Sequence, residues 1–327
     1  MQSVVEIQDL HVSYQSREGV LRPALAGVSF SLLPGEILGV LGESGSGKST
    51  LAAALVQLLP PNGQITKGAA VFEGQDLLQS KPEELRKIRG GRIALIFQEP
   101  SLALHPTMRV SEQVRQVLRA HGSAGKGALR ERTRQVFSAV FSEEADRVSR
   151  SYPHQLSGGQ RQRVLVAQAI ACHPSVIVAD EPTASLDSTT QMEILGVFRT
   201  LRERLGLAMI FITHNPALLP DFADRALVLY AGRIVESGPT PEVLASPRHP
   251  YTKALFRSIP ANFEGSANSR KTRLPAIAGD SSHSSLPRKG CCFEPRCTER
   301  MDICRGREPA LLNWSETQTV SCFKYER

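Results

Sequence analysis

The chain has 327 residues, of which 41% are hydrophobic and 22% charged, and its formal net charge is +7. This length suits one domain of roughly 235 residues plus a smaller module, and the hydrophobic content suffices for a buried core. No apolar stretch reaches 18 residues and the start, MQSVVEIQDL, is unlike a signal peptide, so neither a membrane span nor export is expected. No basic patch with interleaved aromatic residues is present, which argues against a nucleic-acid-binding protein.

Residues 42–50 read GESGSGKST and match the phosphate-binding pattern G-x-x-x-x-G-K-[ST]. An apolar run (EILGVLG) precedes the loop and a helical run (STLAAALVQLL) follows it, so we predict strand, loop and helix. Lys48 would place its ammonium beside the β- and γ-phosphates, Ser49 would contact Mg²⁺, and Thr50 would be a secondary phosphate contact. The residues predicted to bind ATP here are Gly42, Glu43, Ser44, Gly45, Ser46, Gly47, Lys48, Ser49 and Thr50.

Two adjacent carboxylates end a second apolar run, VIVAD, at residues 176–180. Such a run is typical of a buried parallel strand. Asp180 is the natural holder of Mg²⁺, directly or through water, and Glu181 is placed to polarise the attacking water as a general base. Together with the phosphate-binding loop, this pair predicts an ATP-hydrolysing enzyme.

The sequence LSGGQ lies between the phosphate loop and the two carboxylates, at Leu156, Ser157, Gly158, Gly159 and Gln160. Through this motif the chain closely resembles the ATP-binding cassette family. The serine hydroxyl, the unobstructed glycine amides and the following helix N-terminus all suit phosphate. In the family this motif completes the ATP site of a partner. The resemblance therefore implies a second cassette subunit, arranged head to tail, which is a related distinct chain or a second copy of this one.

The resemblance implies further roles. Tyr14 would stack on adenine, although an ordinary half-buried strand residue is the alternative. Gln98 would sense Mg²⁺ and the attacking water, and His214, after the run AMIFIT, would contact the γ-phosphate. The Mg²⁺ set would be Ser49, Gln98 and Asp180. A loop that touches the opposite subunit would contain Ser185, Leu186 and Asp187.

The alternation of strand-like and helical runs predicts an α/β fold with a mainly parallel sheet covered by helices on both faces. The resemblance implies a P-loop ATPase with a small antiparallel β subdomain and a helical subdomain at about residues 98–160. The cassette would span residues 1–235. The segment FQEPSLALHPTMRV would lie where membrane subunits dock.

Residues 236–327 extend beyond a minimal cassette. The stretch containing HPYTKAL resembles the segment that follows the cassette in dipeptide and oligopeptide importers, and a polar connector covers about 262–289. Five cysteines follow, and in a reducing compartment they favour metal ligation over disulfides. The pattern G-C-x-F-x-P-R-C resembles that family's tail and implies a 4Fe-4S cluster on Cys291, Cys297, Cys304 and Cys322, with zinc and unligated thiols as alternatives.

The resemblance as a whole implies the ATPase subunit of a dipeptide or oligopeptide importer, peripheral at the cytoplasmic face of the inner membrane. An importer of nickel or another small solute is the nearest alternative. A soluble cassette ATPase of nucleic-acid repair or translation and an exporter motor are further ones. The implied partners are two integral membrane permeases, an extracytoplasmic solute-binding protein and a second cassette, with no nucleic acid.

Overall fold

The computed structural model describes residues 2–122, 125–258, 277, 279 and 289–326. The chain divides into two compact, interleaved units. Unit 1 contains residues 1–5, 31–37 and 71–212, and unit 2 contains residues 6–30, 38–70 and 213–327. Most of the connector expected at 262–289 lies outside the described residues. The expected boundary between residues 235 and 236 remains a prediction, and it falls within strand β10 (Arg233–Pro239).

Unit 1 is built on parallel strands, as the apolar runs predict. Strand β7 (Val176–Asp180) lies between β6 (Ile93–Ile96) and β8 (Ala208–Thr213) and pairs in parallel with both. Every residue of β7 and β8 is buried. Strands with both faces covered need such continuous apolar sequence, so the runs VIVAD and AMIFIT suit the centre of this unit.

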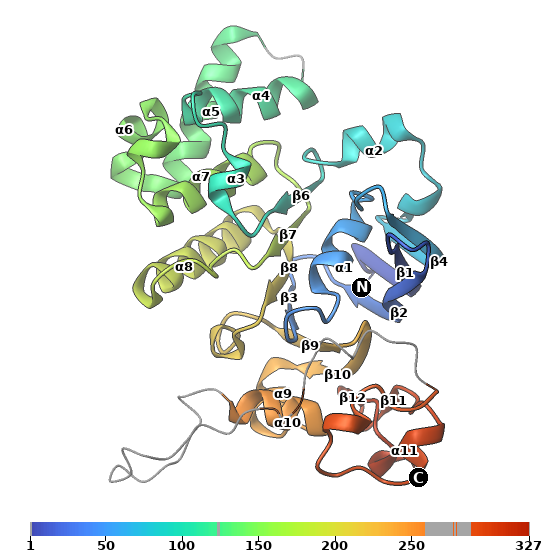
Figure 1. The fold of residues 1–327 in the computed structure, drawn as a ribbon. Helices are drawn as coiled ribbons and strands as arrows, with labels where there is room; N and C mark the ends of the chain where they lie inside the picture. Colours follow the sequence, from blue (N-terminus) through green and yellow to red (C-terminus); the bar gives the residue numbers. More distant parts are fainter. Residues whose placement is uncertain (1, 123–124, 259–276, 278, 280–288, 327) are drawn as a thin grey trace, which may run out of the picture. The chain divides into compact units, whose positions relative to one another are not determined.

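Helices α3 to α7 of unit 1 lie between β6 and β7 in the sequence, and α4 to α7 pack on one another (Figure 1). Helix α4 buries Val110, Val114 and Leu118, which repeat every four residues and form one apolar face. The helices are α2 (Pro82–Ile88), α3 (Pro100–Ala103), α4 (Val110–His121), α5 (Lys126–Phe141), α6 (Ala145–Arg150), α7 (Gly158–Ile170) and α8 (Ser188–Leu205). The shorter elements are β5 (Gln75–Asp76), η1 (Leu77–Gln79), η2 (Ser142–Glu144) and η3 (Pro153–Gln155).

The core of unit 1 depends on aromatic packing between α8 and β8. Phe211 is fully buried and its ring meets that of Phe198 edge to face, with 6.3 Å between centroids. We expect Phe211→Ala to lower the free energy of unfolding by about 3–5 kcal/mol, because it removes buried area and leaves a cavity. Thermal and urea unfolding measure this, with Phe97→Ala, at a 53% exposed position, as the matched control. Equal stability of the two variants would contradict the prediction.

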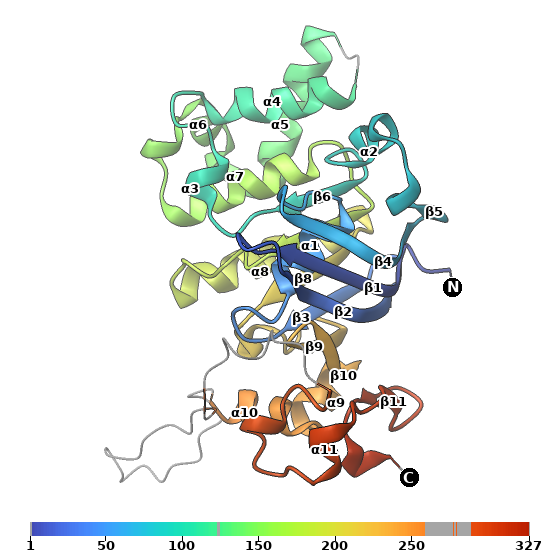
Figure 2. The same ribbon diagram turned by 45° about the vertical axis from the view of Figure 1, so that its right-hand side comes forward.

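Unit 2 contains two groups of strands. In the first, β1 (Val5–Gln15) lies between β2 (Leu21–Leu32) and β4 (Gly63–Phe72), as Figure 2 shows. In the second, the order is β3-β9-β10-β12-β11. The bounds of these other strands are β3 (Ile37–Leu41), β9 (Arg225–Tyr230), β11 (Leu312–Asn313) and β12 (Thr319–Val320).

This second group joins the C-terminal residues to the strand that precedes the phosphate loop. Strand β3 pairs in parallel with β9, β9 pairs antiparallel with β10, and β10 pairs antiparallel with β12. The remaining elements of unit 2 are α1 (Lys48–Leu55), η4 (Pro216–Leu218), α9 (Thr240–Ala245), α10 (Pro250–Arg257), η7 (Glu294–Arg296), α11 (Ile303–Gly306) and η8 (Phe323–Tyr325). None of the helices in the described parts of the chain combines the length and the apolarity that crossing a membrane requires.

Candidate active site

The phosphate-binding loop of unit 2 joins β3 to α1, the predicted order of strand, loop and helix. Lys48 lies at the start of α1, and its ammonium donates to the carbonyl oxygens of Gly42 (2.8 Å) and Glu43 (2.9 Å). Gly47 adopts φ 106° ahead of the helix, and a Cβ there would lie 2.7 Å from the Ala24 carbonyl oxygen. The loop thus arches around a buried ammonium, and the first-turn N–H groups of α1 are the kind that bind phosphate.

Tyr14 and His214 also belong to unit 2. The Tyr14 hydroxyl lies 3.1 Å from Thr50 Oγ1, so the half-buried ring is beside the start of α1, where an adenine-stacking residue is expected. His214 follows β8 directly and is exposed. Asn215, next to it, caps the turn η4 by accepting a hydrogen bond from the Ala217 N–H. The roles of Tyr14 and His214 towards ATP remain predictions.

The carboxylate pair lies in unit 1 at the end of β7. Asp180 is buried, and Glu181 adopts φ 46°, a left-handed conformation that costs energy for a residue with a side chain. The Glu181 N–H donates to the Ile212 carbonyl oxygen, which fixes this turn. The Gln98 side-chain amide donates to Glu181 Oε2 at 3.2 Å. The structure therefore brings together the predicted base and the predicted water-sensing glutamine.

The LSGGQ residues start α7 in unit 1. Ser157 caps the helix: its Oγ accepts from the Gln160 N–H (3.2 Å), and the Gln160 side-chain oxygen accepts from the Ser157 N–H (3.1 Å). A Cβ on Gly159 would lie 2.5 Å from Thr190 Cγ2, so the glycine permits close packing against α8. A Cβ on Gly158 would lie 3.4 Å from Leu186 Cδ2. The motif and the loop of Ser185, Leu186 and Asp187 are therefore neighbours.

Asp187 has a structural role in that loop. Its carboxylate accepts from the N–H (3.0 Å) and the hydroxyl (2.8 Å) of Thr190 and so caps α8. The backbone hydrogen bond from Thr190 is the main cause that lowers the pKa of Asp187. This cap was not predicted from the sequence, although an Asp three residues before Thr190 at a helix start is a recognisable signal.

The cysteine module does not support the expected cluster. Interaction with the Cys292 thiol, and to a smaller extent with the His249 imidazole, lowers the pKa of Cys291. Burial raises the pKa of Cys297 to about 11. Across the described residues, which include all the cysteines, no three or more His, Cys, Asp or Glu side chains are arranged to hold a metal ion. The 4Fe-4S assignment to Cys291, Cys297, Cys304 and Cys322 is thus not supported, because these four thiols do not form such a group.

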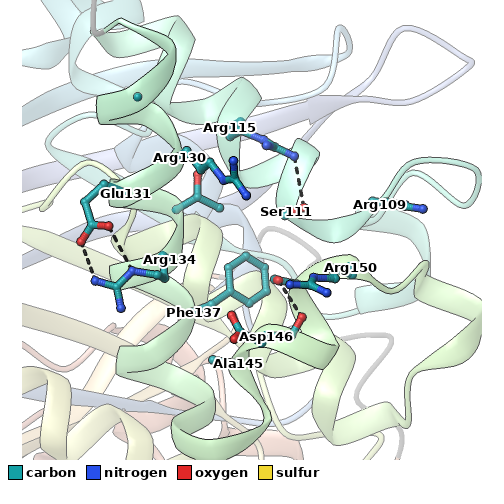
Figure 3. Close-up of a pocket in the computed structure, with 13 residues that line it drawn as sticks. Arg109, Ser111, Arg115, Arg130, Glu131, Arg134, Phe137, Ala145, Asp146 and Arg150 are labelled. Carbon is teal, nitrogen blue, oxygen red and sulfur yellow. Dashed lines mark hydrogen bonds and ion pairs between the residues drawn. The ribbon is translucent and has the colours of Figure 1, made fainter.

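A separate pocket of about 640 Å³ lies among α4, α5 and α6 in unit 1 (Figure 3). Arg134 in its wall is paired with Glu131 through two hydrogen bonds of 3.0 and 2.7 Å, and Arg115 donates to Ser111. None of the residues predicted to bind ATP or Mg²⁺ lines it, but Arg109 belongs to the predicted docking segment. The arginines of this arginine pocket are Arg109, Arg115, Arg130, Arg134 and Arg150, against the carboxylates Glu131 and Asp146.

The strand, loop and helix around Lys48, with the carboxylate pair after β7, define a P-loop nucleotide hydrolase. Comparisons with known proteins identify the family within this broad class. Residues 25–184 match the ABC transporter family, and residues 235–304 match the C-terminal region of oligopeptide/dipeptide transporters. The chain belongs to the ABC transporter family.

Relatives match over nearly the whole chain. A probable peptide ABC transporter ATP-binding protein of Sinorhizobium fredii is 38% identical, over 98% of this chain and 95% of its own length. The oligopeptide transport ATP-binding protein OppD of Escherichia coli is 39% identical, over 98% and 93%. Among solved structures, a dimeric, post-hydrolysis ATP-binding cassette with ADP and Pi is 30% identical, with TM-score 0.64, over 72% of this chain and 98% of its own. The α/β cassette fold predicted from sequence is thereby confirmed.

Proposed function

We propose that the chain is the ATP-hydrolysing subunit of an importer that carries dipeptides or oligopeptides across the cytoplasmic membrane. The ATPase class follows from the family. The match of residues 235–304 to the C-terminal region of oligopeptide/dipeptide transporters carries the choice of cargo, and full-length relatives with dipeptide and oligopeptide names support it. The chain would act as a peripheral subunit on the cytoplasmic side. A nickel or other small-solute importer is the alternative that direct uptake measurements distinguish.

In this proposal each half of the hydrolytic machinery has its own task. Lys48 and the loop amides bind the β- and γ-phosphates, and the hard oxygens of Ser49, Gln98 and Asp180 suit Mg²⁺, which would neutralise phosphate charge when bound. Glu181 accepts a proton from the water whose oxygen bonds to the γ-phosphorus, as the bond to ADP breaks. The 3.2 Å contact from Gln98 to Glu181 supports a shared role for these two side chains. His214 would contact the γ-phosphate.

The LSGGQ motif supports a second cassette. Ser157 is exposed, and its hydroxyl and the α7 N-terminus suit a phosphate supplied by another subunit. The dimeric state of the ATP-binding cassette compared above supports this proposal. An identical copy and a related chain are both compatible with it.

The permeases would dock on the segment after Gln98. Leu102 in α3 is 83% exposed and Phe97 is 53% exposed, which is unusual for such large apolar side chains. Arg109, near the end of this segment, lines the arginine pocket. We therefore expect the docking surface of the permeases to combine an apolar anchor with carboxylates.

Replacing Leu102 with Asp tests this docking surface. We expect association with the permeases to weaken by about 30-fold, since a lost interface anchor costs about 2 kcal/mol. ATP binding by the isolated chain should not change, because Leu102 is not in the ATP-binding machinery. Co-purification from detergent-solubilised membranes and nucleotide titration measure the two effects. Leu205→Asp, at a 38% exposed leucine of α8, is the matched control. Undiminished co-purification of the Leu102 variant would contradict the docking proposal.

The importer assignment itself is tested by what accompanies the chain in its native membrane. Gentle detergent extraction followed by mass spectrometry should recover two permeases, a second cassette and a solute-binding protein. Uptake of a labelled dipeptide and of nickel by the assembled system then separates the two cargo classes. Recovery of only soluble partners or nucleic acid would overturn the transport proposal.

A further inference from the structure

Glu43, the second residue of the phosphate-binding loop, is held by C-terminal residues. Its carboxylate receives two hydrogen bonds from Arg296, at 2.6 Å from Nη1 to Oε2 and 3.0 Å from Nη2 to Oε1. Its backbone N–H donates to the Tyr251 hydroxyl at 2.8 Å. Its carbonyl oxygen accepts from the Lys48 ammonium. Every polar group of this one residue is therefore engaged, two of them by residues more than 200 positions away.

The two C-terminal partners are themselves fixed. Tyr251, in α10, is fully buried, and the Arg296 side chain, in η7, is only 7% exposed. The ring of Phe293 packs against Tyr251 and Tyr230, with centroids 5.4 and 5.2 Å apart. The Arg296 guanidinium lies 5.8 Å from the centre of the Tyr230 ring. This aromatic packing holds Arg296 and Tyr251 in place.

The HPYTKAL motif contains the residues that fix the position of Tyr251. Tyr251 belongs to HPYTKAL, and His249 of the same motif caps α10 by accepting from the Tyr251 N–H at 3.0 Å. The fully buried carboxylate of Glu236 accepts from the His249 N–H (2.9 Å) and from the Gln318 amide (2.9 Å). The motif thus orients the hydroxyl that receives the Glu43 N–H.

The ion pair between Arg296 and Glu43 differs in strength from an ordinary surface ion pair. Exposed ion pairs contribute little because water screens them, whereas a two-fold, charge-assisted pair with a nearly buried arginine is stronger and fixes direction as well as distance. A phosphate loop binds through N–H groups that must point inward, so its shape decides affinity. Since the Glu43 N–H is taken by Tyr251, Glu43 serves as the anchored end of the loop.

We propose that Arg296 and Tyr251 are positioning residues for ATP: through Glu43 they hold the phosphate-binding loop and the Lys48 ammonium in the shape that receives the triphosphate. The C-terminal region is then a working part of the nucleotide site. Neither residue touches ATP in this proposal, so both act on affinity more than on the chemical step.

The test uses the full chain and four variants: Tyr251→Phe, Arg296→Gln, Glu43→Gln and the double variant Arg296→Gln/Glu43→Gln. Equilibrium titration with a fluorescent ATP analogue gives Kd, and steady-state hydrolysis gives KM and kcat. We expect Tyr251→Phe to raise Kd and KM by about threefold to tenfold, with kcat within about twofold. Arg296→Gln should raise them by about tenfold, and the double variant should be no worse than Arg296→Gln alone.

Two matched controls distinguish positioning from general stability. Tyr325→Phe removes a hydroxyl that donates to the Arg248 carbonyl oxygen at 3.1 Å in the same region, and Arg307→Gln breaks an ion pair with Glu326. Both should leave Kd for ATP unchanged. Wild-type affinity in Tyr251→Phe and Arg296→Gln, or equal losses in the controls, would overturn the proposal. If Arg296→Gln does not fold, Tyr251→Phe, which lacks a single oxygen, decides the matter.

Discussion

Glu181→Gln should reduce kcat for ATP hydrolysis by about 10²–10⁴-fold, the contribution typical of a positioned general base. The amide keeps the size of the side chain, and it can still meet Gln98, which contacts Glu181 Oε2 in the structure. It cannot accept the proton that water must lose. We therefore expect ATP to remain bound and the pair of cassettes to stay closed around it. Steady-state phosphate release and nucleotide retention on a size-exclusion column measure the two effects.

The control for this prediction is Glu203→Gln, an exposed position on α8 with the same change of charge. It should hydrolyse ATP at the wild-type rate. Turnover by Glu181→Gln within tenfold of the wild type would show that another group removes the proton. Loss of ATP binding in the same variant would instead place Glu181 in nucleotide binding.

Gly42→Ala should abolish or strongly weaken ATP binding, by tenfold or more. A Cβ at Gly42 would lie 2.3 Å from the Leu229 carbonyl oxygen and 2.5 Å from Ser46 Oγ. The Leu229 carbonyl belongs to β9 and cannot move away freely, so the loop must shift and its N–H groups turn from the phosphates. Overpacking of this kind costs about 1–3 kcal/mol or more, and 1.4 kcal/mol is a factor of ten in Kd.

Nucleotide titration checks this expectation, with Gly196→Ala as the control. Gly196 lies within α8, and a Cβ there meets nothing within 4 Å. That variant should bind ATP normally and gain a few tenths of a kcal/mol or more in stability, because alanine favours helix. Normal ATP affinity in Gly42→Ala would show that the loop tolerates displacement.

The site motifs were predictable from sequence because each is local. The phosphate loop carries its strand, glycines and lysine within a few residues, and the capping box of Ser157 and Gln160 lies within one helical turn. Apolar runs such as VIVAD predicted buried strands because strands covered on both faces need continuous apolar sequence. Hence the family and the fold class followed from short patterns.

The features that could not be predicted from the sequence depend on contacts between residues far apart in the chain. Arg296 and Glu43 are 253 positions apart, and nothing near either residue indicates the other. The two units interleave, and this arrangement depends on contacts between distant stretches of the chain that no local pattern encodes. The cysteine spacing suggested four ligands, but spacing does not encode how the backbone turns place the thiols, and the described residues hold no group of three or more His, Cys, Asp or Glu side chains arranged for a metal ion.

Strand β10 has a practical consequence for anyone who shortens or exchanges parts of this chain. A cut after residue 235 would sever β10 in its middle and leave β9 with half of its antiparallel neighbour. A cut after Pro239 would keep the strand but strip β12 from its other edge and expose an unpaired row of backbone groups, a known route to aggregation. Chimaeras with a related tail should retain binding only when the tail supplies its own β12 and an arginine matched to Glu43. The phosphate-binding loop and the C-terminal residues thus belong to the same compact unit.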